Sequence, residues 1–134
     1  MDFKRIVVRA CADVNPTEDP DKVRVAIERV LGDIPLEIEE GREVKRLVGK
    51  SESPDALFRF HELLRREQIL SAARSVLMKG TQENVICFYL NKQVAYMGHI
   101  SFSQSVGESP LGPIRVEIES DNPRAVIDWL APKV

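Results

Sequence analysis

The sequence predicts an α+β fold, a two-layer sandwich in which an antiparallel-rich sheet of about six strands carries helices on one face. Apolar residues alternate along several short segments, as they do in strands that bury one face of a sheet. In other segments apolar residues recur every three to four positions, as in amphipathic helices. The predicted order, β-α-β-β-α-α-β-β-β-α, lacks the regular βαβ alternation of a parallel sheet.

The first part of the chain contains three predicted strands and one helix. Residues 3–14 form the first strand, whose buried face is expected to carry Ile6, Val8, Ala10 and Ala12. Asp19-Pro20 is typical of a helix start, because an aspartate side chain can accept hydrogen bonds from the free backbone amides of the first turn and proline is well tolerated at the first helical position. Gly32 is expected to end this helix. Two further strands are predicted over residues 34–39 and 43–50.

The second part begins with another cap-and-proline helix start, Ser53-Pro54. The phase of the apolar stripe that follows predicts two helices with a bend near Arg66. The remaining elements follow the same rules. We predict, in this order, a strand over Val85–Leu90, a hairpin turn at Asn91-Lys92 and a strand over residues 93–101. A loop over 102–113, a strand over 114–119 and a helix that starts at Asn122-Pro123 follow.

Composition is that of one globular domain spanning residues 1–134, since 43% of the residues are hydrophobic and 30% are charged. No apolar run approaches the roughly 18–20 residues that span a bilayer, and the charged N-terminal segment does not resemble a signal peptide. We therefore expect a cytoplasmic protein without membrane contact. The net charge of −2 argues against nucleic-acid binding over the whole surface, because affinity for phosphates requires excess positive charge.

The residue types that carry catalysis do not converge in this sequence. Its two histidines and two cysteines lack zinc-ligand spacing, and the cysteines, each inside an apolar run, are expected to be free thiols in the core. The serines of residues 101–109 lack a nucleophile motif, and no phosphate-binding glycine loop is present. Glu117, Glu119 and Asp121 are better explained by cross-strand ion pairs than by a Mg²⁺ site. We expect no catalytic residues, metal or cofactor, and hence no enzyme.

A cluster of basic residues is the strongest candidate for a functional site, and it has two interpretations. It could be a solvated helix face paired with Glu62 and Glu67, or a surface that contacts an RNA backbone. Phe58 is the only aromatic residue that the sequence places beside it. The candidate RNA-binding residues are Arg59, Arg65, Arg66, Arg74 and Lys79, joined by Lys45, Arg46 and Lys50 from the third strand.

Two alternative functions remain open. The predicted hairpin has more apolar residues than are needed to bury one face of a sheet, which favours an interaction or scaffold module acting as a homodimer. These residues are Cys87, Tyr89, Val94 and Tyr96. Alternatively, His99 and the serines of the 99–113 segment could serve a small-molecule enzyme.

Four segments carry a resemblance to a known family. They are residues 16–23 (PTEDPDKV), 60–74 (FHELLRREQILSAAR), 108–114 (ESPLGPI) and 121–123 (DNP). In this order and over nearly the full length, the chain resembles a small archaeal family of uncharacterised proteins. That family is grouped with predicted RNA-binding proteins, including a predicted exosome-associated branch. Its fold is similar to that of the ribosomal large-subunit protein that carries 5S RNA. The resemblance implies RNA or an RNA-containing complex as the partner, and it transfers no catalytic residues.

Overall fold

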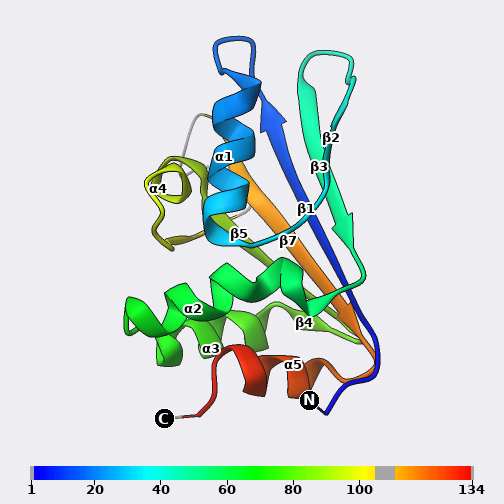
Figure 1. Ribbon diagram of the computed structural model, residues 1–134, viewed down its shortest axis with the longest axis vertical. Coiled ribbons are helices and arrows are strands. Elements are labelled where there is room, and N and C mark those ends of the chain that lie inside the picture. Colours follow the sequence, from blue (N-terminus) through cyan, green and yellow to red (C-terminus); the bar gives the residue numbers. More distant parts are fainter. Residues whose placement is uncertain (1, 105–110, 134) are drawn as a thin grey trace.

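The computed structural model describes residues 2–104 and 111–133, and it has the predicted α+β architecture (Figure 1). Within these residues five α-helices cover one face of a seven-stranded antiparallel sheet. The strands are β1 (Ile6–Val14), β2 (Leu36–Glu39), β3 (Lys45–Ser51), β4 (Thr81–Gln82), β5 (Val85–Asn91), β6 (Phe102–Ser103) and β7 (Pro113–Ser120). The helices are α1 (Pro20–Val30), α2 (Phe58–Arg66), α3 (Leu70–Lys79), α4 (Lys92–Tyr96) and α5 (Pro123–Leu130), with a 3₁₀ turn, η1 (Pro54–Leu57), before α2.

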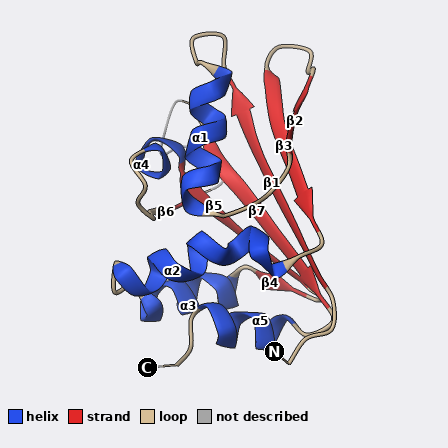
Figure 2. Ribbon diagram, in the orientation of Figure 1, coloured by secondary structure: helices blue, strands red, loops and turns tan. Residues whose placement is uncertain are grey.

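The sheet has the order β2-β3-β1-β7-β5-β4, and β6 pairs with β5. β1 lies at its centre, where Val8 is opposite Ser51 of β3 and Ile118 of β7. Figure 2 shows the helices in two groups over one face, α1 with α4 towards one end and α2, α3 and α5 towards the other. No helix of the described residues lies on the opposite face, so we call it the open face.

The hydrophobic core lies between the sheet and the helices. Four residues of β1 are predicted to face inwards, and they are at most 4% exposed: Ile6, Val8, Ala10 and Ala12. Phe60 of α2 stacks on Phe88 of β5 with ring centroids 5.1 Å apart, which ties the second helical group to the sheet.

Three helix starts follow the predicted chemistry. The side chains of Asp19, Ser53 and Asn122 each accept a hydrogen bond from a backbone amide of the first turn, and proline follows each of them. The bend near Arg66 is also confirmed, because α2 ends there and Gln68 adopts a left-handed conformation with φ of 57°.

The strand predicted over residues 93–101 is wrong, as is the hairpin turn at Asn91-Lys92. The Asn91 side chain accepts a hydrogen bond from the Val94 amide at 2.9 Å and caps the short helix α4. Asparagine suits both a turn and a helix cap, and here the cap prevails because Lys92 and Ala95 become buried. The chain returns to the sheet at β6, inside the predicted loop. The rest of that loop includes residues 105–110, which lie outside the described residues.

Across the two described ranges of the chain, no helix has both the length and the apolar composition needed to cross a bilayer.

Candidate nucleic-acid interface

The eight predicted basic residues do not form one surface. Arg46 and Lys50 of β3 pair in register with Asp13 and Arg9 of β1, so they lie on the open face. Lys45 precedes them on the same strand, 3.9 Å from Glu40. The other five lie on α2 and α3, over the opposite face of the sheet (Figure 1).

Two of the helical arginines hold the fold together. Arg65 donates to the backbone carbonyls of Trp129 and Leu130, both at 3.1 Å, at the end of α5. Arg74 is only 14% exposed; it lies 2.8 Å from the Asp128 carboxylate and donates to the Ala131 carbonyl at 3.0 Å. A cation near the last carbonyls of a helix satisfies acceptors that lack an intrahelical partner. Arg65 and Arg74 are therefore committed to α5.

Three helical cations remain available to a ligand. Arg66 is 70% exposed and lies 3.9 Å from Glu62, a distance at which the ion pair contributes little. Arg59 and Lys79 are exposed, and in the described part of the chain their side chains have no hydrogen bond or ion pair.

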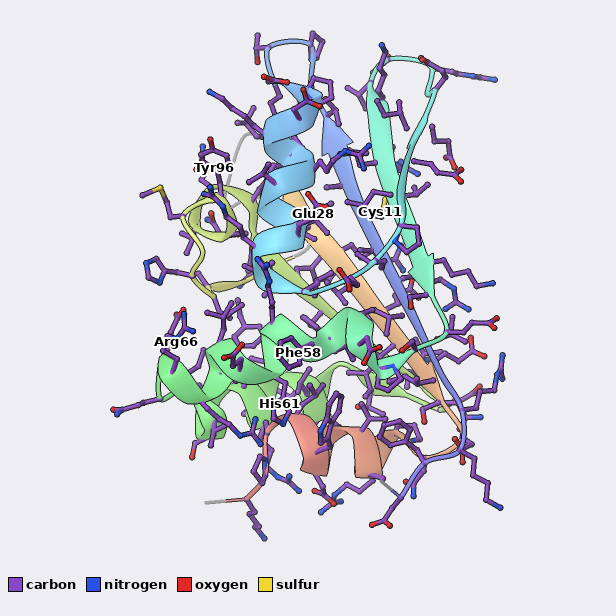
Figure 3. The ribbon with its side chains drawn as sticks, viewed as in Figure 1. Cys11, Glu28, Phe58, His61, Arg66 and Tyr96 are labelled. Carbon is purple, nitrogen blue, oxygen red and sulfur yellow. The ribbon has the colours of Figure 1, made fainter. Side chains whose placement is uncertain are left out.

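One exposed aromatic side chain lies beside Arg59, and further aromatic rings that sequence reasoning missed lie along α2 and α5. Phe58 is 62% exposed at the start of α2, and His61 is its neighbour one turn along (Figure 3). The His61 ring stacks on Trp129 of α5 with centroids 4.9 Å apart. Trp129 in turn meets Phe3, with centroids 6.1 Å apart. We call Phe3, Trp129, His61 and Phe58 the aromatic strip.

The start of α2 is held against the end of α1 by backbone contacts. The Leu31 carbonyl accepts hydrogen bonds from the amides of Arg59 and Phe60, at 2.7 and 3.1 Å. Gly32 allows this close approach, because a Cβ atom at that position would lie 2.5 Å from the Asp55 carbonyl oxygen. The sequence signal for this junction was the glycine that ends α1.

A groove of about 640 Å³ opens beside this junction. We call it the α1–α2 groove. Residues from the end of α1, from η1 and from the start of α2 line it, among them Glu28, Asp33, Asp55, Phe58 and Arg59.

The strip is neutral near pH 7. Burial, together with the Arg65 charge, lowers the pKa of His61 below its ordinary value, so its ring is uncharged at neutral pH. A neutral imidazole stacked on indole adds flat, partly apolar surface next to the exposed Phe58 ring.

The open face has mixed charge, as predicted, and does not form a basic groove. Arg9 and Arg5 lie 2.8 and 3.3 Å from Glu119, and Arg115 lies 3.4 Å from Glu117. Arg9 holds the pKa of Glu119 below its usual range. Paired charges of both signs do not follow a phosphate backbone.

The cysteines and the predicted dimer residues divide between the two faces. Cys11 and Cys87 are free and half-buried on the open face, not in the core, and burial raises the pKa of Cys11. Tyr89 lies beside Cys87 on the same face, and burial raises its pKa. Val94 and Tyr96 instead belong to α4, which packs against α1 on the helical side. The four residues therefore do not form one surface.

The segment considered for small-molecule chemistry is only partly described. His99 is 66% exposed and its Nδ1 lies 3.3 Å from Glu67. Ser105 and Ser109 lie outside the described residues. Among the residues that are described, no group of three or more His, Cys, Asp or Glu side chains could hold a metal ion.

Comparison with known proteins identifies the class. Residues 6–120 match a family model whose description is RNA binding, so the chain belongs to the α+β protein family that this model defines. More particularly, the chain belongs to the UPF0201 family of archaeal proteins. It is 42% identical over 129 residues to the UPF0201 protein of Metallosphaera sedula, covering 96% of this chain and 88% of that one. It is 48% identical over 121 residues to that of Sulfurisphaera tokodaii, covering 90% and 83%.

Solved structures agree with this assignment. The crystal structure of the UPF0201 protein from Methanococcus jannaschii superposes with a TM-score of 0.83 at 38% identity, covering 96% of this chain and 94% of that one. A DUF54 protein from Methanothermobacter thermautotrophicus shares the fold at a TM-score of 0.60 and 19% identity, covering 95% and 99%. The family expected from the sequence resemblance is therefore confirmed.

Proposed function

We propose that this protein binds single-stranded RNA through the aromatic strip and two exposed arginines of α2, Arg59 next to Phe58 and Arg66 at the end of the helix, without a catalytic step. The observation that carries the proposal is the 62% exposed ring of Phe58 beside Arg59, whose guanidinium has no partner in the described part of the chain. An unpaired base stacks on such a ring while a neighbouring guanidinium contacts its phosphate. The description of the matching family model supports RNA as the ligand class.

The charge distribution predicts modest affinity and a shallow salt dependence. The chain carries a net charge of −2, and Arg65 and Arg74 are committed to α5. With two phosphate contacts, at about −0.7 per phosphate on a single strand, the slope of log affinity against log salt should be about −1.4. A dedicated basic RNA-binding domain gives a much steeper slope.

Fluorescence anisotropy of a labelled, unstructured oligouridine across a salt series tests the proposal. Phe58→Ala removes the stacking surface and should weaken binding about tenfold, because base–aromatic stacking contributes about 1–3 kcal/mol per base. Arg59→Gln should weaken binding and reduce the salt slope by about 0.7.

Matched substitutions away from the strip serve as controls. Met97→Ala removes a hydrophobic side chain that is 69% exposed at the end of α4. Lys79→Gln removes an exposed cation of α3 that has no ion pair within the described ranges. Both should leave affinity within about twofold of the unmodified protein. Affinity weaker than about millimolar at low salt, or affinity independent of salt, would overturn the proposal.

A second candidate function, a homodimer formed through the open face, rests on a row across the sheet in which three half-buried side chains flank the exposed Arg115. Val48, Cys11, Arg115 and Tyr89 are neighbours in register on β3, β1, β7 and β5. Burying this row against a second copy would remove the side chains of Val48, Cys11 and Tyr89 from water. Sedimentation equilibrium is the test: a dimer that Tyr89→Lys dissociates supports it, and a strict monomer at the highest soluble concentration excludes it.

A further inference from the structure

The α1–α2 groove lies next to the strip, and the proposed stacking on Phe58 does not use it. The Phe58 ring stands between the two, since it belongs to the strip and also lines the groove. With a volume of about 640 Å³, the groove has room for a nucleotide. Backbone hydrogen bonds between α1 and α2 hold its two sides in place.

Most of the charged side chains that line the groove are acidic, whereas the strip itself is neutral. Glu28, Asp33 and Asp55 line the groove, and their carboxylates have no hydrogen bond or ion pair within the described residues. Of the two arginines beside them, Arg29 donates to the Tyr96 carbonyl and lies over the Tyr96 ring, 5.0 Å from its centroid. Arg59 has no such partner among the residues that the structure describes. A phosphate inside the groove would meet excess negative charge, so we place phosphates at its edge, near Arg59.

We propose that the α1–α2 groove accepts one unpaired guanine base of the bound RNA, with a groove carboxylate receiving hydrogen bonds from its Watson–Crick edge. This inference rests on the proposed function, because the base reaches the groove from the strand stacked on Phe58. Guanine presents two adjacent donors, N1–H and N2–H, which match the two acceptor oxygens of a carboxylate.

The other bases lack this match. Adenine and cytosine each present one amino donor next to a ring nitrogen acceptor, so the second carboxylate oxygen faces a lone pair. Uracil presents one N–H between two carbonyl oxygens, and both of these repel a carboxylate. A carboxylate on the groove wall therefore selects guanine, whereas stacking on Phe58 does not distinguish between bases.

The experiment compares seven-nucleotide RNAs that are uridine except at the central position, which is guanine, adenine, cytosine, uracil or hypoxanthine. The guanine RNA should bind about tenfold more tightly than the uracil RNA, in the range that a bidentate base contact provides. Hypoxanthine, which lacks the amino group of guanine, should lose most of that advantage.

Amide substitutions then test the carboxylates. The combined variant E28Q/D33N/D55N should bring the guanine RNA to within about twofold of the uracil RNA, and the single variants identify the carboxylate responsible. Glu43→Gln is the matched control; it removes one exposed carboxylate between β2 and β3 and should keep the guanine preference. Thermal unfolding of each variant shows that it is folded.

The two proposals fail in different ways. If all five RNAs bind equally, with the expected salt dependence and loss on Phe58→Ala, the guanine inference is wrong and the RNA-binding proposal stands. A guanine preference that survives the combined variant also refutes the inference. If none of the RNAs binds, the proposed function fails and takes the inference with it.

Discussion

Lys92 and Glu18 form a buried ion pair that joins the start of α4 to the turn before α1, with Lys92 Nζ 3.0 Å from Glu18 Oε1. The same ammonium donates to the carbonyls of Asp13 and Leu111, at 2.7 and 2.8 Å. The side chains of Lys92 and Glu18 are only 4% and 12% exposed. Burial tends to raise the pKa of Glu18, but hydrogen bonds from Asn15 and Lys92 outweigh it and lower that pKa below its ordinary value.

Replacing Lys92 by methionine should destabilise the protein strongly. The substitution removes the ammonium that pairs with the buried Glu18 carboxylate and donates to the carbonyls of Asp13 and Leu111, and among the described residues only the Asn15 hydrogen bonds to Glu18 remain. This loss should cost about 3 kcal/mol of unfolding free energy. Urea denaturation measures the change, with Lys22→Met on the exposed side of α1 as the control, expected within about 0.5 kcal/mol of the unmodified protein. Equal urea midpoints for the two variants would contradict this role for Lys92.

Replacing Gly32 by alanine should separate α1 from α2. Gly32 has φ of 150°, and an added Cβ would lie 2.5 Å from the Asp55 carbonyl oxygen, so we expect a loss of about 2 kcal/mol or more. Gly98→Ala provides the comparison, because Gly98 also has positive φ, 84°, but open space around it. That variant should lose about 1 kcal/mol. Thermal unfolding that ranks Gly98→Ala as the more damaging change would refute the steric explanation.

Acidification should protonate His61 at a pH below its ordinary pKa of 6.5. Burial and the Arg65 charge lower the folded-state pKa, so the contribution of neutral His61 to stability is complete above about pH 6.5 and is lost as the pH falls through the folded value. Fluorescence of Trp129, the only tryptophan in the sequence, reports the titration because an imidazolium on the indole quenches it.

The fluorescence transition should have its midpoint below pH 6.5 and disappear in His61→Phe, which retains an aromatic ring without a titrating group. His99→Gln, which removes the other histidine, should leave it unchanged. A midpoint above 6.5 contradicts the burial of His61.

Arg74 should matter for stability and not for RNA. Arg74→Gln loses the ion pair to Asp128 and the hydrogen bond to the Ala131 carbonyl, at a cost of about 1–2 kcal/mol measured by urea denaturation. Its effect on oligouridine affinity should not exceed that of Lys79→Gln. If Arg74→Gln weakened binding as much as Arg59→Gln, the division between structural and available cations would be wrong.

Helix starts could be predicted from the sequence because their chemistry is local. Asp19, Ser53 and Asn122 each cap amides two or three residues further on, and the proline after each favours the first helical turn. The short helix α4 could not be distinguished from a strand in this way, because Asn91 is suited both to a hairpin turn and to a helix cap. The helix is favoured by the ion pair of Lys92 with Glu18, a residue distant in the chain.

The candidate site was only partly visible in the sequence. The basic residues of α2 and α3 could be named, but Arg65 and Arg74 are committed to carbonyls of residues 129–131 that no local pattern places nearby. Phe58 could be singled out, whereas Trp129 and Phe3 come from opposite ends of the chain. The three-residue spacing of Phe58 and His61 was a signal that could have extended the site along α2.

By itself, the sequence determined the α+β class, the inward face of β1, the mixed charge of the outward face and the family resemblance. These follow from hydrophobic alternation, residue type and residue order, which each segment carries locally. Only the tertiary structure decided which cations remain available, where the aromatic strip lies and that Lys92 is buried. The reason is physical: a side chain takes its partner from whichever distant segment packs beside it, and packing depends on the whole core at once.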